Sequence, residues 1–251
     1  MRDINLRMLM NNLYNSLDYY ASIPAEGVVN FEEDYQHKIK IDPDGKIRNL
    51  LLERRQSLAG VKNITDYLEG LSAGKILDIG CGLGWILSSL GNGWDKHGIE
   101  ISKFASKHAS QFGNIYNGSI DEYSGKEFDV IVMNHVIEHL SDPLDALNKI
   151  KSFLKPNGIF IIGTPDFDSA ASRRYGSNFR LLHDPTHISL FSCDSMHRFL
   201  RDNGFKIMRV EFPFFDTPWF TKKNLLRIID RNVISPPFYG SIMTFFCSRI
   251  N

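Results

Sequence analysis

An acid and three glycines stand at alternate positions of one short segment. They are Asp78, Gly80, Gly82 and Gly84 in DIGCGLG. A strand-like run ends at this segment, and a helix-like run, WILSSLG, begins at its end. Glycine lets the backbone turn sharply, and its missing side chain leaves room for a ligand to lie against the chain. The segment therefore predicts a ligand-binding loop between a strand and a helix.

A second acid, Glu100, ends the next strand-like run, HGIE. A carboxylate at this place can accept hydrogen bonds from both hydroxyls of a ribose, which implies a nucleoside-containing cofactor. The dinucleotide fingerprint GxGxxG needs a glycine where Trp85 stands. Asp78 is unfavourable beside a charged pyrophosphate and suits the ammonium group of a methionine moiety. The pattern favours S-adenosylmethionine, with an NAD-dependent oxidoreductase as the weaker alternative.

From Lys75 onward, strand-like and helix-like runs alternate. The runs are KILDIG, WILSSLG, KHGIEIS, KFASKHASQFG, NIYNGSI, FDVIVMNHVIEHL, DALNKIKSFLKPNG and IFIIGTP. This alternation is typical of an α/β fold, in which helices cover both faces of a parallel sheet. Residues 194–203 predict a further short helix that ends at Gly204, and SIMTFFCSRI predicts a last strand.

Taken in order, these blocks resemble the class I S-adenosylmethionine-dependent methyltransferases, in particular the bacterial type 11 and type 23 group that acts on small molecules. The resemblance runs from about Lys75 to the C-terminus. It rests on ILDIGCGLG, GIEIS, FDVIVMNHVIEHLSDP, LKPNGIFIIGTPD, HDPTHISLFS and the Gly-Phe before KIMRVEF. It implies a Rossmann-like mixed sheet of seven strands in the order 3-2-1-4-5-7-6, whose last strand is antiparallel, with helices on both faces and an N-terminal helical extension.

Carried over position by position, the resemblance assigns cofactor contacts. Asp78, Gly80, Gly82 and Gly84 would hold the methionine part, Glu100 the ribose, Ser119 and Ile120 would flank the adenine, Asn134 and His135 would line the sulfonium side, and Cys81 and Ile101 would complete the set. The implied cofactor is S-adenosyl-L-methionine, and the implied product is S-adenosyl-L-homocysteine.

A first pair of histidines follows the fourth strand-like run, in His135-Val-Ile-Glu138-His139. The spacing matches HxxEH, in which two histidines on a helix bind zinc and the glutamate acts on water. Here the motif stands at the carboxyl end of a strand, where similar methyltransferases have a Glu-His-Leu sequence that binds no metal. We therefore expect no metal, buried structural hydrogen bonds for Glu138 and His139, and a place near the cleft for His135.

A second pair, His183 and His187, has the same spacing, but Pro185 interrupts a helix and predicts a loop. Ligands gather beyond the carboxyl ends of the strands, so this loop would overhang the acceptor pocket. Either histidine could take a proton from an acceptor hydroxyl or amine, oriented by Asp184 or Asp166, or could simply brace the loop. The candidate bases are His135, His183 and His187.

The composition narrows the class of partner. Lys plus Arg and Asp plus Glu number 29 each, so no global positive field favours nucleic acid. No run approaches the roughly 18 apolar residues of a membrane span, and the N-terminal residues do not resemble a signal peptide. We expect a cytoplasmic protein with a small-molecule partner and no membrane span. The three scattered cysteines predict neither a disulfide framework nor a structural zinc site.

The pattern of apolar residues divides the chain into two parts. Residues 1–70 predict a helical extension or lid, because the leucines of 51–71 recur with helical period. Residues 71–251 predict the methyltransferase domain, with substrate-side insertions at about 164–193 and 213–240. Aromatic residues in PFFDTPWF and SPPFY would wall the acceptor pocket or pack in the core. Cations that could meet an anionic acceptor are Arg173, Arg174, Arg180, Lys222 and Lys223.

The expected activity is in-line methyl transfer to a small-molecule acceptor. Because the methyl group of a sulfonium is already activated, the protein mainly aligns donor and acceptor, which can supply roughly 7–11 kcal/mol. The resemblance points to a metabolite or a sugar of bacterial surface polysaccharides as the acceptor. The alternative from a different class is a methyltransferase-like subunit that has lost catalysis and serves as a binding module.

Overall fold

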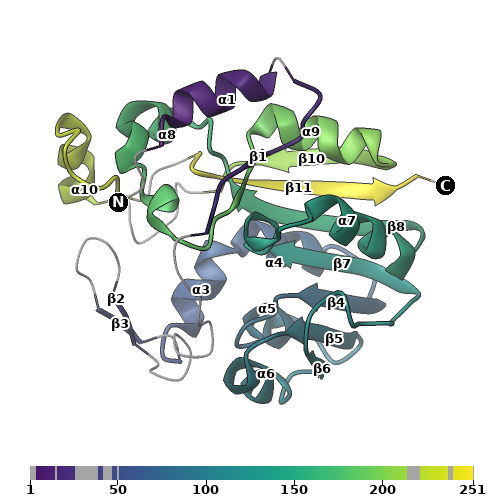
Figure 1. The fold of residues 1–251 in the computed structure, drawn as a ribbon. Coiled ribbons are helices and arrows are strands. Elements are labelled where there is room, and N and C mark those ends of the chain that lie inside the picture. The colour runs from purple at the N-terminus through teal and green to yellow at the C-terminus, as the bar shows by residue number, and fades with distance from the viewer. Residues whose placement is uncertain are drawn as a thin grey trace.

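The computed structural model has a seven-stranded sheet at its centre (Figure 1). It describes residues 4–14, 16–25, 39–41, 47–49, 51–213, 221–236 and 240–250. In spatial order the strands are β10, β11, β8, β7, β4, β5 and β6. Their bounds are β4 Lys75–Ile79, β5 Asp95–Glu100, β6 Asn114–Asn117, β7 Phe128–Asn134, β8 Leu154–Pro165, β10 Phe205–Glu211 and β11 Ile242–Arg249.

The order and direction of these strands agree with the predicted fold. Counted from β4, the order from the β6 edge to the β10 edge is 3-2-1-4-5-7-6. The last strand, β11, runs antiparallel to both of its neighbours, while β4 pairs in parallel with β5 and β7. The chain returns from the β6 edge to β7 beside β4. The loops after β4 and β7 therefore face each other at a topological switch point, where ligands bind in such sheets.

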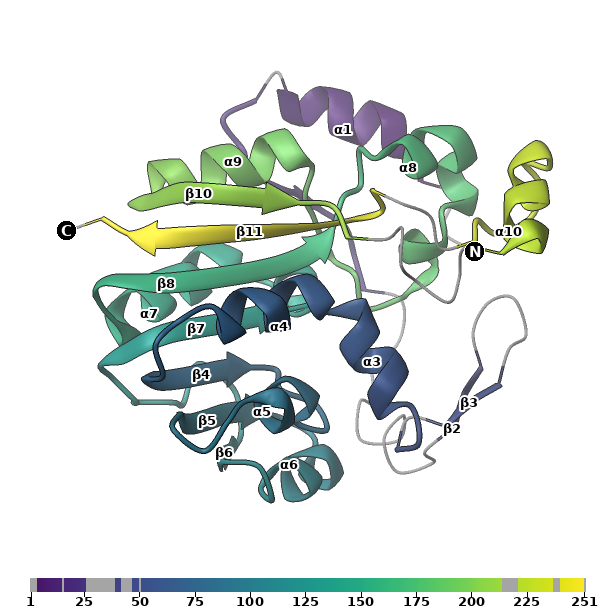
Figure 2. The same ribbon diagram turned by 180° about the vertical axis from the view of Figure 1, so that it is seen from behind.

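Helices cover both faces of the sheet (Figures 1 and 2). One face carries α4 (Lys62–Glu69), α5 (Trp85–Ser89) and α6 (Lys103–Ala109), and the other carries α7 (Pro143–Phe153) and α9 (Cys193–Asp202). Successive strand residues point to opposite faces, so Ile76 packs with α4 and α5 while Leu77 packs with α7. Two apolar clusters result, and their strands read as nearly continuous apolar runs because both faces are buried.

Capping residues fix where the helices begin. The Asp142 carboxylate accepts the backbone N–H of Asp145 at 2.9 Å, and Pro143 occupies the first turn of α7. Ser192 and Ser195 form a reciprocal capping box at the start of α9. The predicted helix at 194–203 is therefore present, and Gly204 follows it with a φ of +84°.

The N-terminal residues pack on the segment between β8 and α9. Helix α1 (Leu6–Tyr14) buries Leu6, Met10 and Leu13 in a third apolar cluster with Phe167 and Phe179. Strand β1 (Ala21–Ser22) pairs antiparallel with β9 (Ser189–Leu190). The remaining elements of this region are α8 (Ala170–Tyr175) and the 3₁₀ helices η2 (Gly176–Asn178) and η3 (Arg180–His183). The chain's start is thus joined to the predicted insertion at 164–193.

The predicted helical approach at 51–71 consists of two helices, α3 (Arg54–Gly60) and α4, which meet at Val61. Before them β2 (Ile39–Ile41) and β3 (Ile47–Asn49) form an antiparallel pair. Residues 26–38 and 42–46 of the predicted extension or lid lie outside the described residues, as do residues 214–220 and 237–239 of the predicted aromatic wall. The second insertion contains α10 (Lys222–Leu226) and the 3₁₀ helix η4 (Arg227–Ile229). The division at residue 70 stays a prediction.

The three cysteines are free thiols, of which Cys81 and Cys247 are buried and Cys193 is half-buried. Among the described residues, none of the helices has both the length and the apolar character that crossing a bilayer demands.

Candidate active site

The predicted ligand-binding loop leaves β4 with all three of its glycines in the left-handed region. The φ angles of Gly80, Gly82 and Gly84 are +70°, +53° and +78°. The N–H groups of Gly80 and Cys81 donate to the carbonyl of Ile99 at 2.8 and 3.1 Å, which ties the loop to β5. L-residues rarely adopt this conformation, so the glycines give the loop its shape.

Two of these glycines also permit close packing. A Cβ atom on Gly80 would clash with Cγ2 of Val136, in the loop after β7. A Cβ atom on Gly84 would lie 2.9 Å from the Cβ of Ala109, in α6. Gly80 thus lets the loops after β4 and β7 approach each other, whereas Gly84 lets α5 approach α6.

The Glu100 carboxylate is held at the end of β5 by two backbone donors. Its Oε2 accepts the N–H of Gly82 and its Oε1 accepts the N–H of Ser102, each at 2.8 Å. The side chain is 5% exposed. A carboxylate has about four lone-pair positions, so it can accept ligand hydroxyls in addition to backbone donors. Glu100 therefore couples the shape of the glycine loop to the place expected for the ribose.

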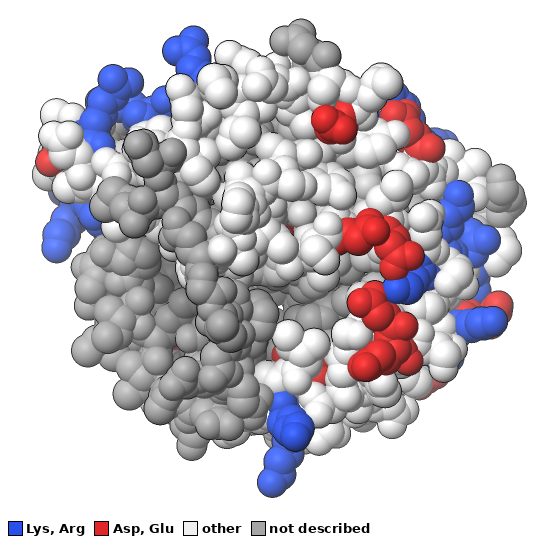
Figure 3. Space-filling view, viewed as in Figure 1, with Lys and Arg blue, Asp and Glu red and all other residues white. Residues whose placement is uncertain are grey.

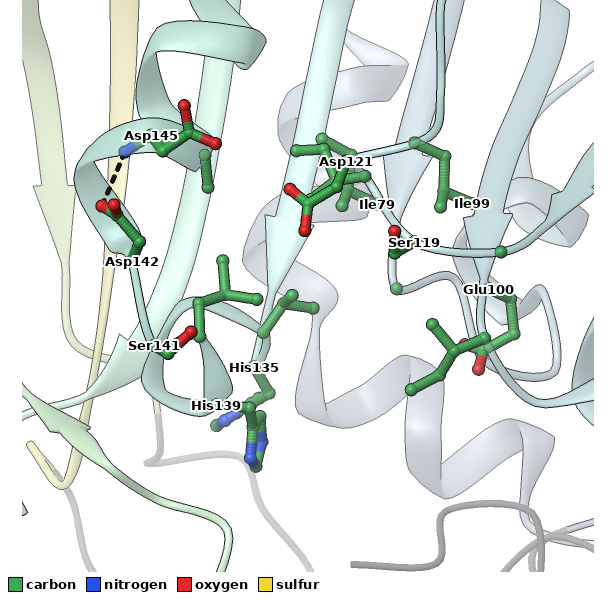
Figure 4. Close-up of a pocket in the computed structure, with 17 residues that line it drawn as sticks. Ile79, Ile99, Glu100, Ser119, Asp121, His135, His139, Ser141, Asp142 and Asp145 are labelled. Carbon is green, nitrogen blue, oxygen red and sulfur yellow. Dashed lines mark hydrogen bonds between the residues drawn. The ribbon is translucent and has the colours of Figure 1, made fainter. Parts of the chain in front are cut away.

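A cavity of about 300 Å³ opens between the ends of β4, β5 and β7 (Figure 4). Figure 4 shows Glu100 and Ser119 on one side of it and His135 and His139 on the other. The predicted cofactor residues that line it are Gly80, Glu100, Ile101, Ser119, Ile120 and His135. Apolar side chains next to the hydrogen-bonded carboxylate of Glu100 suit a nucleoside, whose base is flat and whose ribose is hydroxylated.

A second cavity, of about 230 Å³, lies on the other side of the glycine loop. Gly80 lines both cavities, so the two adjoin. The other predicted cofactor residues that line the second cavity are Asp78, Cys81, Gly82 and Asn134. Gly84 lines neither cavity. Every other predicted cofactor residue thus lines one of two adjoining cavities, although contact with a cofactor itself stays a prediction.

Two lining groups carried no recognisable signal in the sequence. Ser57, in α3, and Val61, where α3 meets α4, line the second cavity. They lie in a helical segment whose leucine spacing indicates only packing. Asp121 and Asp142 line the first cavity, and Lys149 joins its two rims through ion pairs with Asp121, at 2.7 Å, and with Asp145. Figure 3 shows acidic residues gathered with a basic one on this face of the molecule.

Asp78 is an acid in an unusual electrostatic position. Its side chain is 2% exposed, and burial, together with the nearby charge of Glu100, raises the pKa of Asp78 to about 8. The second cavity is therefore lined by a carboxyl group that is largely protonated at neutral pH. A cationic ligand in this cavity would favour the ionised form, which is the expected behaviour of an ammonium-binding acid.

His135 follows β7 with a φ of +55°, a conformation uncommon for a residue other than glycine. Its Nδ1 lies 3.0 Å from Oε1 of Glu138, and its side chain is 37% exposed. When Nδ1 donates to this carboxylate, the lone pair of the neutral imidazole is on Nε2. Strained backbone is often found at functional sites. His135 is the only predicted base that lines either cavity.

Glu138 is fully buried yet strongly acidic. Burial alone would raise the pKa of Glu138, but the hydrogen bond from His135 and the neighbouring histidines lower it to about 2. Its Oε2 accepts the hydroxyl of Thr164 at 3.0 Å. His187 is uncharged at neutral pH, because burial lowers its pKa to about 4. At neutral pH the hydrogen bond from His135 is therefore the main cause of the low pKa of Glu138. Glu138 therefore holds His135 in one tautomer and orientation.

The histidines that stand four residues apart in the sequence are not the ones that meet in the fold. The segment after His135 forms only the 3₁₀ helix η1 (Ile137–His139), so His135 and His139 do not share a helix face. Instead the rings of His139 and His187 lie 4.8 Å apart. Among the described residues, Glu138, His139 and His187 each offer one metal-ligand atom within 4.8 Å of the others. They combine one histidine from each predicted pair.

Hydrogen bonds within the protein already use these side chains. Nδ1 of His187 lies 2.5 Å from the carbonyl of Leu181, and Nδ1 of His139 lies 3.2 Å from the carbonyl of Thr186. The bond between His139 and Thr186 ties η1 to the segment before β9, and so does the N–H of Ile188, which donates to the backbone carbonyl of Glu138 at 2.8 Å. The group therefore acts as a brace between two loops, as expected for Glu138 and His139, and the expected absence of a metal stays a prediction.

Neither His183 nor His187 lines either of the two cavities. His187 is 4% exposed, and its Nε2 lies 3.8 Å from Oδ2 of Asp184. His183 Nε2 is buried and has no hydrogen-bond partner among the described residues. Asp166, whose pKa burial raises to about 6, accepts the N–H of Asp168 at 2.9 Å rather than orienting either histidine. The geometry thus favours His135 among the three candidate bases.

Arg173, one of the expected cations, makes hydrogen bonds within the protein. The Nε of Arg173 donates to Asp168 at 2.8 Å, and the hydroxyl of Tyr14 in α1 donates to the same carboxylate at 2.8 Å. Asp168 thereby links Tyr14 of α1 to Arg173 of α8. Arg173 therefore helps to hold the N-terminal helix in place, and its contact with an anionic acceptor stays a prediction.

Comparison with known proteins defines the class. A family model described as a methyltransferase domain matches residues 48–210. A methyltransferase from Archaeoglobus fulgidus described as SAM-dependent has the same fold, with a TM-score of 0.55 at 21% identity over 80% of this chain and 99% of that one. The chain therefore belongs to the methyltransferase domain family. The sequence resemblance to the methyltransferases is thus confirmed for the family, and the predicted Rossmann-like fold is confirmed with it.

Two curated relatives match parts of the chain. A malonyl-[acyl-carrier protein] O-methyltransferase of Halalkalibacterium halodurans is 33% identical over 103 residues, which are 36% of this chain and 38% of that protein. A ubiquinone biosynthesis O-methyltransferase of Actinobacillus pleuropneumoniae is 28% identical over 142 residues, 49% of this chain and 58% of that protein. The chain thus spans less than two thirds of the length of either relative.

Proposed function

We propose that this protein transfers a methyl group from S-adenosylmethionine to a small-molecule acceptor. The observation that carries the proposal is the pair of adjoining cavities that share Gly80, one lined by Asp78 and the other by Glu100. This arrangement suits a ligand with a cationic amino-acid end and a nucleoside end. A dinucleotide suits it less, because Asp78 would repel a pyrophosphate and Trp85 replaces the glycine of its fingerprint.

Each end of the cofactor meets a different part of the sheet edge. The ammonium group lies against Asp78, and the glycine loop provides the turn that admits the methionine part. Glu100 accepts the ribose hydroxyls while its backbone donors hold it in place. The adenine lies among the apolar residues Ile101 and Ile120. Bound S-adenosylmethionine supplies a methyl group that its sulfonium already activates, so the residues around it need only align the acceptor and exclude water.

His135 is the proposed base for an acceptor hydroxyl or ammonium. Its Nδ1 is held by the buried Glu138, so the Nε2 lone pair is the basic position. A base placed in this way adds about 10² to 10⁴ in rate. Glu138 acts through His135 and is a positioning residue. His183 and His187 remain weaker candidates because neither lines a cavity.

The acceptor is proposed at two levels of detail. The two curated relatives are named O-methyltransferases, one of a malonyl carrier protein and one of ubiquinone biosynthesis, which supports transfer to oxygen. The finer proposal is a sugar or another metabolite of surface polysaccharide biosynthesis, methylated in the cytoplasm. It rests on the resemblance of the sequence blocks around the site.

Calorimetric titration of the full chain tests the cofactor. S-adenosylmethionine and S-adenosylhomocysteine should bind with micromolar dissociation constants, and NADH should release no heat. Gly82→Arg should abolish binding, because a long side chain would fill the second cavity and strain a backbone with a φ of +53°. Gly91→Arg is the matched control, since a Cβ at Gly91 meets nothing within 4 Å. Absence of heat with both adenosyl compounds in the intact protein would refute the proposal.

Transfer is then followed with a methyl-labelled cofactor and a panel of hydroxylated and aminated metabolites. Label in an extracted small molecule supports the enzyme. Binding without turnover across the whole panel, including sugar nucleotides, would instead favour a methyltransferase-like subunit that only binds.

A further inference from the structure

The short helical segment 222–229, made of α10 and η4, turns its apolar side chains outward. Leu226 is 67% exposed and Ile229 77%, and Leu225 and Ile228 beside them are 39% and 38% exposed. No side chain of α10 is buried. A surface helix ordinarily buries its apolar stripe against the core. An exposed cluster of large apolar residues marks a surface that binds something.

Backbone groups, rather than these apolar side chains, attach the segment to the rest of the molecule. Arg174 in α8 donates from Nη2 to the carbonyl of Ile228 at 3.0 Å, and the hydroxyl of Tyr175 donates to the carbonyl of Arg227 at 3.0 Å. Asn178 in η2 donates to the carbonyl of Arg231 at 3.0 Å. The segment is therefore held by its main chain, which leaves its leucine and isoleucine side chains directed to solvent.

Cations border the apolar residues. Residues 222–231 contain four cations, Lys222, Lys223, Arg227 and Arg231, and one acid, Asp230, for a net formal charge of +3 in a chain whose total is zero. Figure 3 shows basic side chains around the uncharged atoms at the edge of the molecule where α10 lies in Figure 1. The positive charge is thus local to this segment.

We infer that segment 222–229 docks the protein on an anionic lipid surface. Leucine and isoleucine side chains can enter the boundary between headgroups and acyl chains, while lysine and arginine meet the anionic headgroups. The segment projects from the same end of the molecule as the loops that form the cavities (Figure 1). Docking would therefore present the site to molecules held at a membrane. This inference goes beyond the proposed transfer and does not depend on it.

Vesicle flotation with the full chain tests the inference. The protein should float with vesicles of equal parts phosphatidylglycerol and phosphatidylcholine and stay behind with vesicles of phosphatidylcholine alone. Added salt should weaken binding, because it screens the headgroup charge. Lys222→Ala with Lys223→Ala should lower the partition coefficient about 30-fold, at the ordinary effect of two surface cations. Leu226→Ser with Ile229→Ser should lower it at least about tenfold.

Matched controls separate this surface from general stickiness. Leu17→Ser with Leu52→Ser removes two leucines that are 95% and 81% exposed elsewhere, and should leave the partition coefficient unchanged. Lys103→Ala with Lys107→Ala does the same for cations on α6. Circular dichroism melting confirms that each variant is folded. Wild-type protein that fails to float, or segment variants that float like the wild type, would overturn the inference. So would a dimer formed through this segment without lipid, seen by analytical ultracentrifugation together with no vesicle binding.

Discussion

Two buried acids near the candidate site have pKa values on opposite sides of the ordinary range. Asp78 is raised to about 8, chiefly by burial, whereas Glu138 is lowered to about 2 despite complete burial. The difference lies in their partners, because Glu138 accepts from His135 and Thr164 while Asp78 faces the charge of Glu100. Divergent acids of this kind are a mark of functional sites. Glu138 is suited to orient a base, and Asp78 is suited to bind a cation.

The pKa of Asp78 predicts how cofactor binding depends on pH. In the free protein the carboxyl group is protonated below about pH 8, and binding an ammonium group requires it to ionise. Affinity for S-adenosylmethionine should therefore rise by up to about tenfold per pH unit between about pH 6 and 8. Titrations at several pH values check this. Asp78→Asn should bind weakly with a flat profile, and a wild-type profile equally flat would contradict the assignment.

The same acids affect stability in opposite directions. Because the pKa of Asp78 is higher in the folded state than its ordinary value of 3.8, its contribution to the free energy of unfolding falls as pH rises from about 4 to 8. Glu138 contributes stability that is complete above about pH 4.5 and lost as pH falls towards 2. Glu138→Gln should therefore flatten the acid side of the urea-unfolding profile. A profile that keeps the wild-type acid slope would show that another group causes it.

His135→Asn is the substitution that tests the base. Asparagine tolerates the left-handed backbone, so the loop keeps its shape while the imidazole is lost. We expect kcat to fall about 10² to 10⁴-fold, the dissociation constant of S-adenosylmethionine to change little, and the acidic limb of the pH profile of kcat at saturating S-adenosylmethionine to disappear. His183→Asn is the comparison. If it abolished the acidic limb and His135→Asn did not, the base would be His183.

At the scale of the element, Gly84 shows how one position can serve packing rather than a ligand. Ala at this site would strain a φ of +78° and place a Cβ 2.9 Å from Ala109. Gly84→Ala should lower the free energy of unfolding by about 2–4 kcal/mol, from the left-handed conformation and from crowding between α5 and α6. Gly91→Ala, where a Cβ meets open space, should change it by less than about 0.5 kcal/mol. Urea unfolding of both variants measures the difference, and similar losses in the two would disprove the packing role.

The elements themselves were more predictable than their partners. Glycines and caps such as Gly204 and Asp142 act within a few residues, so the start or end of a helix can be read locally. The histidine pairs could not be read in this way. His135 and His139 stand four residues apart, but the left-handed backbone at His135 prevents a helix that would place them on one face. A loop nearly fifty residues later instead brings His187 to His139. Contacts between distant loops depend on the folded backbone, which spacing does not record.

At the scale of the whole molecule, the order of the sheet was predictable because alternating strands and helices leave few topologies open. The glycine loop and Glu100 followed from it, since the ends of neighbouring parallel strands meet at one edge. The attachment of α1 was not predictable. Its short apolar stripe indicates only that some partner covers it, and the partner, the segment after β8, is more than 150 residues away.

This architecture separates the cofactor cavities from the N-terminal packing, and the separation can be tested with one substitution. Met10 is 1% exposed in the cluster formed by α1, whereas Met8, on the same helix, is 57% exposed. Met10→Ala should lower the free energy of unfolding by about 2–5 kcal/mol, and Met8→Ala should leave it nearly unchanged. No residue of that cluster lines either cavity, so the affinity of Met10→Ala for S-adenosylmethionine should stay within about twofold of the wild type. Chemical unfolding and calorimetry measure the two quantities on the same protein. A large loss of cofactor affinity at a temperature where Met10→Ala is still folded would show that α1 shapes the cavities, because the cluster would then be coupled to the glycine loop through β8 and β9.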